Sequence, residues 1–238
     1  MKNPLLNEYI EILSTVKSYI EDEIELGFRE LLATEQTSSS QDTLFNLTNQ
    51  REEIIFDTME DIRKAVEECQ KCPLYKTRTN IVFGSGDENA RLAFVGEAPG
   101  YEEDQQGKPF VGKAGQKLTQ IINAMGLSRE EVYITNVLKC RPPNNRNPLP
   151  NEIEACEPYL IAQLRIIKPK IICALGTFSA QTLLKTDQQI SKLRGRFHTY
   201  QGIKLMPTYH PAFLLRNPKY KKDVWEDVQK VMAEYAKG

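Results

Sequence analysis

The sequence predicts an α/β protein whose parallel sheet is covered by helices on both faces. Short apolar runs of strand length alternate with longer segments in which apolar residues recur at helical spacing. Strands that alternate with helices favour a parallel sheet. Because ligands of such sheets bind at the carboxyl ends of the strands, we expect the functional site there.

The individual elements follow in chain order, beginning with a helix from Asp57. Buried strands are predicted at 92–95, 132–137, 171–175 and 203–206. Helices are predicted near 116–125, 153–167 and 177–184. The noteworthy loops each follow a strand, at 96–115, 136–150 and 208–215. These loops are therefore the places to look for chemistry.

The N-terminal region differs in character from the rest of the chain. Residues 1–34 predict a long amphipathic helix, because apolar residues recur every three or four positions. Residues 35–56 lack periodicity and predict a linker, and 57–238 form the main domain. The apolar stripe of the helix either packs onto that domain or recruits a partner protein.

The net charge of −1 is unevenly divided. Residues 1–60 carry 4 basic and 13 acidic side chains, giving −9, whereas the remainder carries 27 basic and 19 acidic, giving +8. A positive domain suits a polyanionic partner, although many enzymes reach such a balance by chance. The apolar runs are too short for a transmembrane helix, and the N-terminus lacks the order of a signal peptide. We therefore expect a soluble, cytoplasmic protein with no membrane partner.

Four cysteines suggest a metal or cluster site. Cys69 and Cys72 form a C-x-x-C pair, and Cys140 and Cys156 lie far downstream. Structural zinc and a 4Fe-4S cluster both remain open on spacing alone, and ordinary buried thiols are the third interpretation. Cys173 lies within an apolar strand, so we expect it in the core.

Three motifs occupy the predicted loops. Residues 96–100 read GEAPG, and a GKPFVG segment follows at 107–112. The second loop begins with TNVLKCRPP at 135–143, and the third carries YHPAFLLR at 209–216. Glycines let a backbone turn tightly and approach a ligand closely, but each motif alone is weak evidence.

Together with the cysteines, and in this order, these motifs resemble the family 4 (iron-sulfur) uracil-DNA glycosylases across roughly residues 60–235. The resemblance implies a three-layer α/β/α sandwich with a central four-stranded parallel sheet, preceded here by the N-terminal helical extension. It implies excision of uracil from single- or double-stranded DNA in base excision repair, with a 4Fe-4S cluster as cofactor. The implied cluster ligands are Cys69, Cys72, Cys140 and Cys156.

The resemblance also assigns the residues that recognise uracil. Phe110 matches the aromatic that stacks on the flipped base, and Asn136 matches the amide that pairs with uracil N3–H and O4. An amide held in one orientation distinguishes uracil from cytosine, which presents the opposite pattern at both atoms. Glu103 is the candidate for excluding the methyl group of thymine.

Two further residues are candidates for catalysis. His210 matches the donor to uracil O2, where negative charge develops as the glycosidic bond breaks. Related families carry an aspartate that positions water, but here that position in the uracil site is Ala98. We therefore expect the neighbouring Glu97 to orient the water or to stabilise the sugar cation.

Two alternatives stand beside this interpretation. The chain could be a non-catalytic, cluster-containing module that binds DNA or associates with a polymerase, although Glu97, Phe110, Asn136 and His210 together argue against it. A related cross-linking group uses a histidine in a basic loop as a covalent trap, but the segment with His198 lacks that group's inserted basic loop, so we expect only a surface or phosphate-contact role. We expect the protein to be a monomer.

Overall fold

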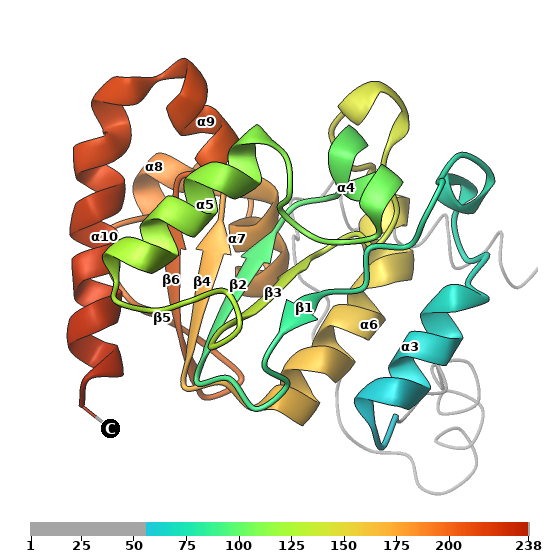
Figure 1. The fold of residues 1–238 in the computed structure, drawn as a ribbon, viewed down its shortest axis with the longest axis horizontal. Helices are drawn as coiled ribbons and strands as arrows, with labels where there is room; N and C mark the ends of the chain where they lie inside the picture. Colours follow the sequence, from blue (N-terminus) through green and yellow to red (C-terminus); the bar gives the residue numbers. More distant parts are fainter. Residues whose placement is uncertain (1–55, 238) are drawn as a thin grey trace, which may run out of the picture. The chain divides into compact units, whose positions relative to one another are not determined.

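The computed structural model describes residues 56–237, coloured in Figure 1. The predicted helix at 1–34 and nearly all of the linker at 35–56 therefore lie outside the described residues. The described part is an α/β domain around one sheet, with strand order β1-β3-β2-β4-β6-β5. No helix within it is both long and apolar enough to cross a membrane.

The centre of the sheet is the predicted set of four parallel strands. These are β2 (Leu92–Gly96), β3 (Tyr133–Asn136), β4 (Ile171–Leu175) and β6 (Ile203–Thr208). β2 pairs in parallel with β3 and β4, and β4 pairs in parallel with β6. The apolar runs at these positions are buried almost throughout, as expected for strands covered on both faces.

The described sheet has two more strands than predicted, one at each edge. β1 (Ser85–Gly86) pairs antiparallel with β3, and β5 (His198–Tyr200) pairs antiparallel with β6. β1 has two residues and β5 has three, so neither is long enough to show an alternating pattern. β5 and β6 form a hairpin whose turn residues, Gln201 and Gly202, both have positive φ.

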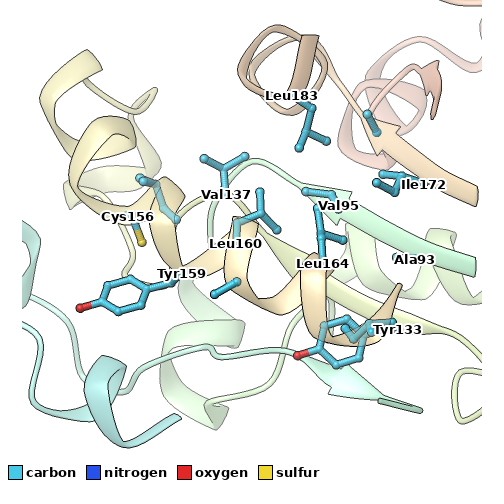
Figure 2. Close-up of a cluster of buried hydrophobic side chains, with 14 of the residues drawn as sticks. Ala93, Val95, Tyr133, Val137, Cys156, Tyr159, Leu160, Leu164, Ile172 and Leu183 are labelled. Carbon is cyan, nitrogen blue, oxygen red and sulfur yellow. The ribbon is translucent and has the colours of Figure 1, made fainter. Parts of the chain in front are cut away.

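Helices cover both faces of the sheet and create two apolar cores. One core joins Ala93 and Val95 of β2 to α6 (Pro150–Ile167) and α7 (Thr177–Leu184), and α3 (Met59–Glu67) packs against α6. Figure 2 shows Leu160 and Leu164 of α6 pointing toward these β2 side chains. The fold is therefore layered as predicted.

The other core contains Leu92 and Phe94, which alternate with the residues of the first core along β2. They pack with α5 (Lys113–Ala124) and with the apolar side of α10 (Lys221–Tyr235). Cys173 is 1% exposed within this core, which confirms the prediction that it is a packing residue.

The loop predicted at 96–115 contains a short helix, which corrects the sequence analysis. α4 (Tyr101–Gln106) begins after Gly100 and ends at Gly107, whose φ is 68°. Its sequence has no apolar periodicity, so only its capping contacts and its packing mark it as helical. The remaining elements are α8 (Ile190–Leu193), α9 (Pro211–Arg216), η1 (Pro73–Lys76), η2 (Pro143–Asn145) and η3 (Pro218–Tyr220).

Candidate active site

A cleft lies where β2, β3 and β6 end. Segments that follow these three strands line it, together with α4 and the start of α5. All six predicted uracil-binding and catalytic residues line this cleft: Glu97, Ala98, Glu103, Phe110, Asn136 and His210. The fold thus brings together side chains that are more than a hundred positions apart in the sequence.

Asn136 ends β3 and presents an unpaired acceptor to the cleft. The residue is 2% exposed, and within residues 56–237 its buried Oδ1 has no hydrogen-bond partner. Buried polar atoms are normally hydrogen-bonded, so an unpaired oxygen at this position marks a site for a donor from a ligand. The neighbouring Gly96 is essential to the arrangement, because a Cβ there would lie 2.3 Å from this oxygen.

Phe110 closes the cleft from the loop after α4. Its backbone has φ of 53°, which is unusual for a bulky residue, and its side chain is 6% exposed. A Cβ on Gly96 would lie 2.5 Å from Phe110 Cζ, so the ring packs directly over the end of β2. A left-handed aromatic residue held by its surroundings is typical of a functional site.

Glu103 fixes this loop from α4. Its Oε1 accepts hydrogen bonds of 2.9 Å from the backbone N–H groups of Val111 and Gly112, and its Oε2 accepts one of 3.1 Å from Gly100. The carboxylate therefore both caps the start of α4 at Gly100 and binds the backbone of the Phe110 loop. This loop-fixing function was not predicted, and the sequence spacing carried no signal for it.

His210 stands at the N-terminus of α9 with a defined tautomer. Its Nδ1 accepts a hydrogen bond of 3.1 Å from the Ala212 N–H, so the neutral ring carries its hydrogen on Nε2. Burial, assisted by Arg216, lowers the pKa of His210 to about 4. The ring is thus a neutral donor at physiological pH. Gly176, with φ of 93°, gives it space, because a Cβ there would lie 3.0 Å from His210 Cβ.

Glu97 directly follows β2 and borders the same cleft. Burial raises the pKa of its carboxyl group to about 7. A carboxylate with such a pKa exchanges a proton near neutral pH, which suits a general base. The next residue, Ala98, supplies no second carboxylate.

The rim of the cleft carries basic and aromatic side chains beside the exposed carboxylate of Glu102. Lys113, Arg146 and Arg216 line it, and Tyr101 and Leu215 are 54% and 44% exposed. The Arg141 guanidinium lies 5.1 Å from the centre of the Tyr101 ring. These rim residues were not predicted individually. His198 is not among the lining residues, and its Nε2 lies 2.9 Å from the Leu193 carbonyl oxygen.

The four candidate cluster cysteines line a second, small cavity. The thiols come from separate elements: Cys69 after α3, Cys72 before η1, Cys140 after β3, and Cys156 on α6. All four are free, and burial raises the pKa of Cys156 to about 12. In residues 56–237, no three His, Cys, Asp or Glu side chains gather closely enough to hold one metal ion.

Positive groups border these sulfur atoms. Arg78 donates a hydrogen bond of 3.2 Å from Nη1 to Cys140 Sγ, and the backbone N–H of Lys139 donates one of 3.3 Å to Cys156 Sγ. Donors of this kind favour thiolates and electron-rich sulfur ligands. Lys139 itself is buried, and burial lowers its pKa to about 8.

The fold and cleft fit a known class of protein. Residues 83–229, which contain all six strands of the described sheet and the cleft, match the family model of the Uracil DNA glycosylase superfamily. The match begins after Cys69 and Cys72, so it does not include the C-x-x-C pair.

Relatives of this chain indicate one family within that superfamily. A type-4 uracil-DNA glycosylase of Saccharolobus solfataricus is 50% identical over 184 residues, which is 74% of this chain and 85% of that protein. The type-4 uracil-DNA glycosylase of Archaeoglobus fulgidus is 44% identical, and the match covers 74% of this chain and 92% of that protein. The one of Thermotoga maritima is 46% identical, and the match covers 73% of this chain and 93% of that protein. The chain belongs to the type-4 uracil-DNA glycosylase family.

Proposed function

We propose that this protein hydrolyses the N-glycosidic bond of uracil in DNA, releasing free uracil and leaving an abasic site for base excision repair. The observation that carries the proposal is the unpaired, buried Oδ1 of Asn136 at the floor of a cleft closed by Phe110. Membership of the type-4 uracil-DNA glycosylase family supports the same function.

Recognition of uracil follows from the Asn136 amide. Its Oδ1 accepts the hydrogen of uracil N3, and its Nδ2 donates to uracil O4. Cytosine has an acceptor at N3 and a donor at its exocyclic amine, so both contacts become repulsive. A base extruded from the DNA stack is held by this edge and by stacking on the Phe110 ring.

Exclusion of thymine is proposed to depend on Glu103. The support is its position: its carboxylate accepts hydrogen bonds from the N–H groups of Val111 and Gly112, which hold the Phe110 loop against α4, and a third from Gly100. A loop held in this way leaves little freedom to admit an extra methyl group. In this proposal Glu103 acts mainly by fixing the wall of the cleft.

Catalysis is proposed to combine a neutral donor with a buried base. When the bond between uracil N1 and C1′ breaks, its electron pair moves onto the base, and the Nε2–H of His210 stabilises the charge at O2. Glu97 accepts a proton from a water molecule, whose oxygen then bonds to the electron-poor C1′. A preorganised neutral donor avoids transferring a full proton to the leaving base.

The DNA partner is proposed to lie across the basic rim. Lys113, Arg146 and Arg216 surround the cleft and suit contacts to phosphates. The exposed Tyr101 and Leu215 offer apolar surface beside the extruded base.

The cofactor is proposed to be a 4Fe-4S cluster bound by Cys69, Cys72, Cys140 and Cys156. The support is that all four thiols line one cavity, which suits four cysteine ligands of one cluster. When bound, the cluster supplies a covalent cross-link between the end of α3, the loop after β3 and α6.

Three further proposals concern the oligomeric state, the localisation and segment 1–34. We propose a monomer of the cytoplasm, with segment 1–34 as the place for a protein partner. Gel filtration with light scattering tests the monomer, and deletion of 1–34 with an excision assay tests whether the segment is separate from catalysis.

The central experiment incubates purified protein with single- and double-stranded oligonucleotides containing uracil, and then cleaves abasic sites with alkali. We expect cleavage at uracil but not at cytosine or thymine in the same position. His210→Ala, purified in parallel, controls for a contaminating glycosylase. Binding of DNA without cleavage would instead identify the non-catalytic module.

A further inference from the structure

Lys139 is a buried cation that forms no ion pair with a carboxylate in residues 56–237, although it lines the same cavity as Cys140 and Cys156. Its side chain is 1% exposed, and none of the ion pairs found in the described part of the chain includes it. Desolvating a charge is costly unless its hydrogen-bonding groups are satisfied. An apolar side chain of the same length would fill this space at lower cost, so the cation requires another explanation.

The ammonium group instead binds three neutral oxygens. Lys139 Nζ donates hydrogen bonds of 2.7 Å to Thr135 Oγ1, to the backbone oxygen of Asn136 and to Gln163 Oε1. Three such bonds use all three N–H donors of an ammonium group. One of them therefore fixes the main chain of the residue whose side chain reads uracil.

The other two acceptors are themselves anchored. Thr135 Oγ1 and Gln163 Nε2 each donate a hydrogen bond of 3.0 Å to the backbone oxygen of Phe83. Gln163 Nε2 also lies 3.2 Å from the Tyr133 hydroxyl. Every hydrogen bond of this network is buried, so the ammonium group has a defined position beside the end of β3.

The main chain of Lys139 is held as well. Its N–H donates to Cys156 Sγ at 3.3 Å, and its backbone oxygen accepts a hydrogen bond of 2.9 Å from Val82. Lys139 is thus fixed at both ends, with its backbone beside the thiol cavity and its ammonium group under Asn136.

We propose that Lys139 is a positioning residue for uracil excision, which holds the Asn136 backbone so that its amide points into the cleft. The inference rests on the proposed function, because it concerns the residue that reads uracil. Lys139 lines the thiol cavity and not the cleft, so any effect on uracil must pass through a neighbour, and Asn136 is the one it bonds that also lines the cleft.

A double-mutant cycle separates this role from general stabilisation. Lys139→Met, Asn136→Ala and the double variant are compared by single-turnover excision of uracil. We expect Lys139→Met to lower the rate about tenfold or more, the coupling found within one hydrogen-bond network. In the Asn136→Ala background the same change should have almost no further effect. Losses that multiply independently would overturn the proposal.

Two further measurements complete the test. Iron per protein should match the wild type in Lys139→Met, because its backbone bond to Cys156 is unchanged, and loss of iron would assign Lys139 to the cavity instead.

Thr135→Val is the matched control: it removes one acceptor of Lys139 but keeps the bond to Asn136. We expect it to lower the melting temperature while excision stays within about threefold of the wild type. An equal loss of excision in both variants would show a purely structural role.

Lys139→Gln passes through the same cycle in parallel, so that the test stands if the methionine variant does not fold. We expect this variant to show a smaller loss that also disappears in the Asn136→Ala background. If the wild-type protein excised no uracil, the proposed function itself would be rejected. If the wild-type protein is active but the two substitutions lower the excision rate independently, only the role of Lys139 is rejected.

Discussion

The Phe110 ring lies 5.6 Å from the His210 imidazole, centre to centre, with the two planes tilted by 32°. The aromatic that is proposed to hold the base and the donor proposed to stabilise it as a leaving group therefore share one end of the cleft. Their backbones belong to different segments, one in the loop before α5 and the other in the loop after β6. Binding and bond cleavage can thus be altered separately, as the following predictions require.

His210→Ala should lower single-turnover excision by a factor on the order of a hundred to a thousand, about 3 to 4 kcal/mol, because a preorganised donor to O2 is lost. Affinity for uracil-containing DNA should barely change, since phosphate contacts supply most of it. Excision, DNA affinity and thermal melting are measured on the same preparation. A stable variant with a near-normal rate would eliminate the catalytic role.

Asn136→Asp should weaken uracil excision by roughly ten- to a hundredfold, because a carboxylate loses the donor to O4. The ratio of uracil to cytosine excision should fall, even if cytosine is still removed slowly. The measurement compares both bases in one oligonucleotide context. An unchanged ratio would show that Asn136 does not read the base edge.

Gly96→Ala should impair excision and reduce stability by about 1 to 3 kcal/mol, because the added methyl group collides with Asn136 and Phe110. Gly126→Ala is the control: its φ of 77° also disfavours alanine, but its Cβ would meet nothing within 4 Å. The control should lose stability and keep full excision. Equal impairment of both variants would place the effect in stability alone.

Excision should rise with pH through about 7, because Glu97 must be ionised to accept a proton and burial raises its pKa to about 7. His210, with a pKa of about 4, should add no second limb above pH 5. Glu97→Gln should be slow and lack the limb near pH 7. A wild-type profile that is flat from pH 6 to 8 would contradict the assignment.

The raised pKa of Glu97 also predicts how the stability of the fold depends on pH. The folded protein holds the Glu97 proton more tightly than the unfolded chain, so this contribution is complete below pH 4.5 and is lost as pH rises through about 7. Glu97→Gln should therefore melt higher than the wild type at pH 8. We expect a gain of about 1 to 3 kcal/mol, allowing for the part of the carboxylate that water reaches. At pH 4 the difference should vanish.

The purified protein should be brown with broad violet-blue absorbance, and Cys69→Ser or Cys140→Ser should remove that band. Iron and zinc are quantified in the same samples. Cys173→Ser is the matched control, because this thiol lies in the core beside α10 rather than in the cavity. Stoichiometric zinc in a colourless wild-type protein would reject the cluster.

The sequence by itself determined the centre of the fold, and its family resemblance supplied the candidate members of the site. The runs at 92–95 and 171–175 are short, apolar and bounded by turn residues, so a buried strand was the natural prediction. The six candidate residues came from the resemblance that the loop motifs carry together, and the fold places all six along one cleft. Edge strands of two and three residues and the helix α4 lacked such a pattern, since pairing partners and capping contacts stabilise them.

Only the tertiary structure decided how those residues act on one another. The unpaired oxygen of Asn136, the loop-fixing bonds of Glu103 and the buried ammonium group of Lys139 all depend on contacts between segments distant in the chain. Burial likewise set the pKa of Glu97 and of His210. Sequence periodicity reports which side of an element is apolar, whereas desolvation and hydrogen bonding depend on what packs against it.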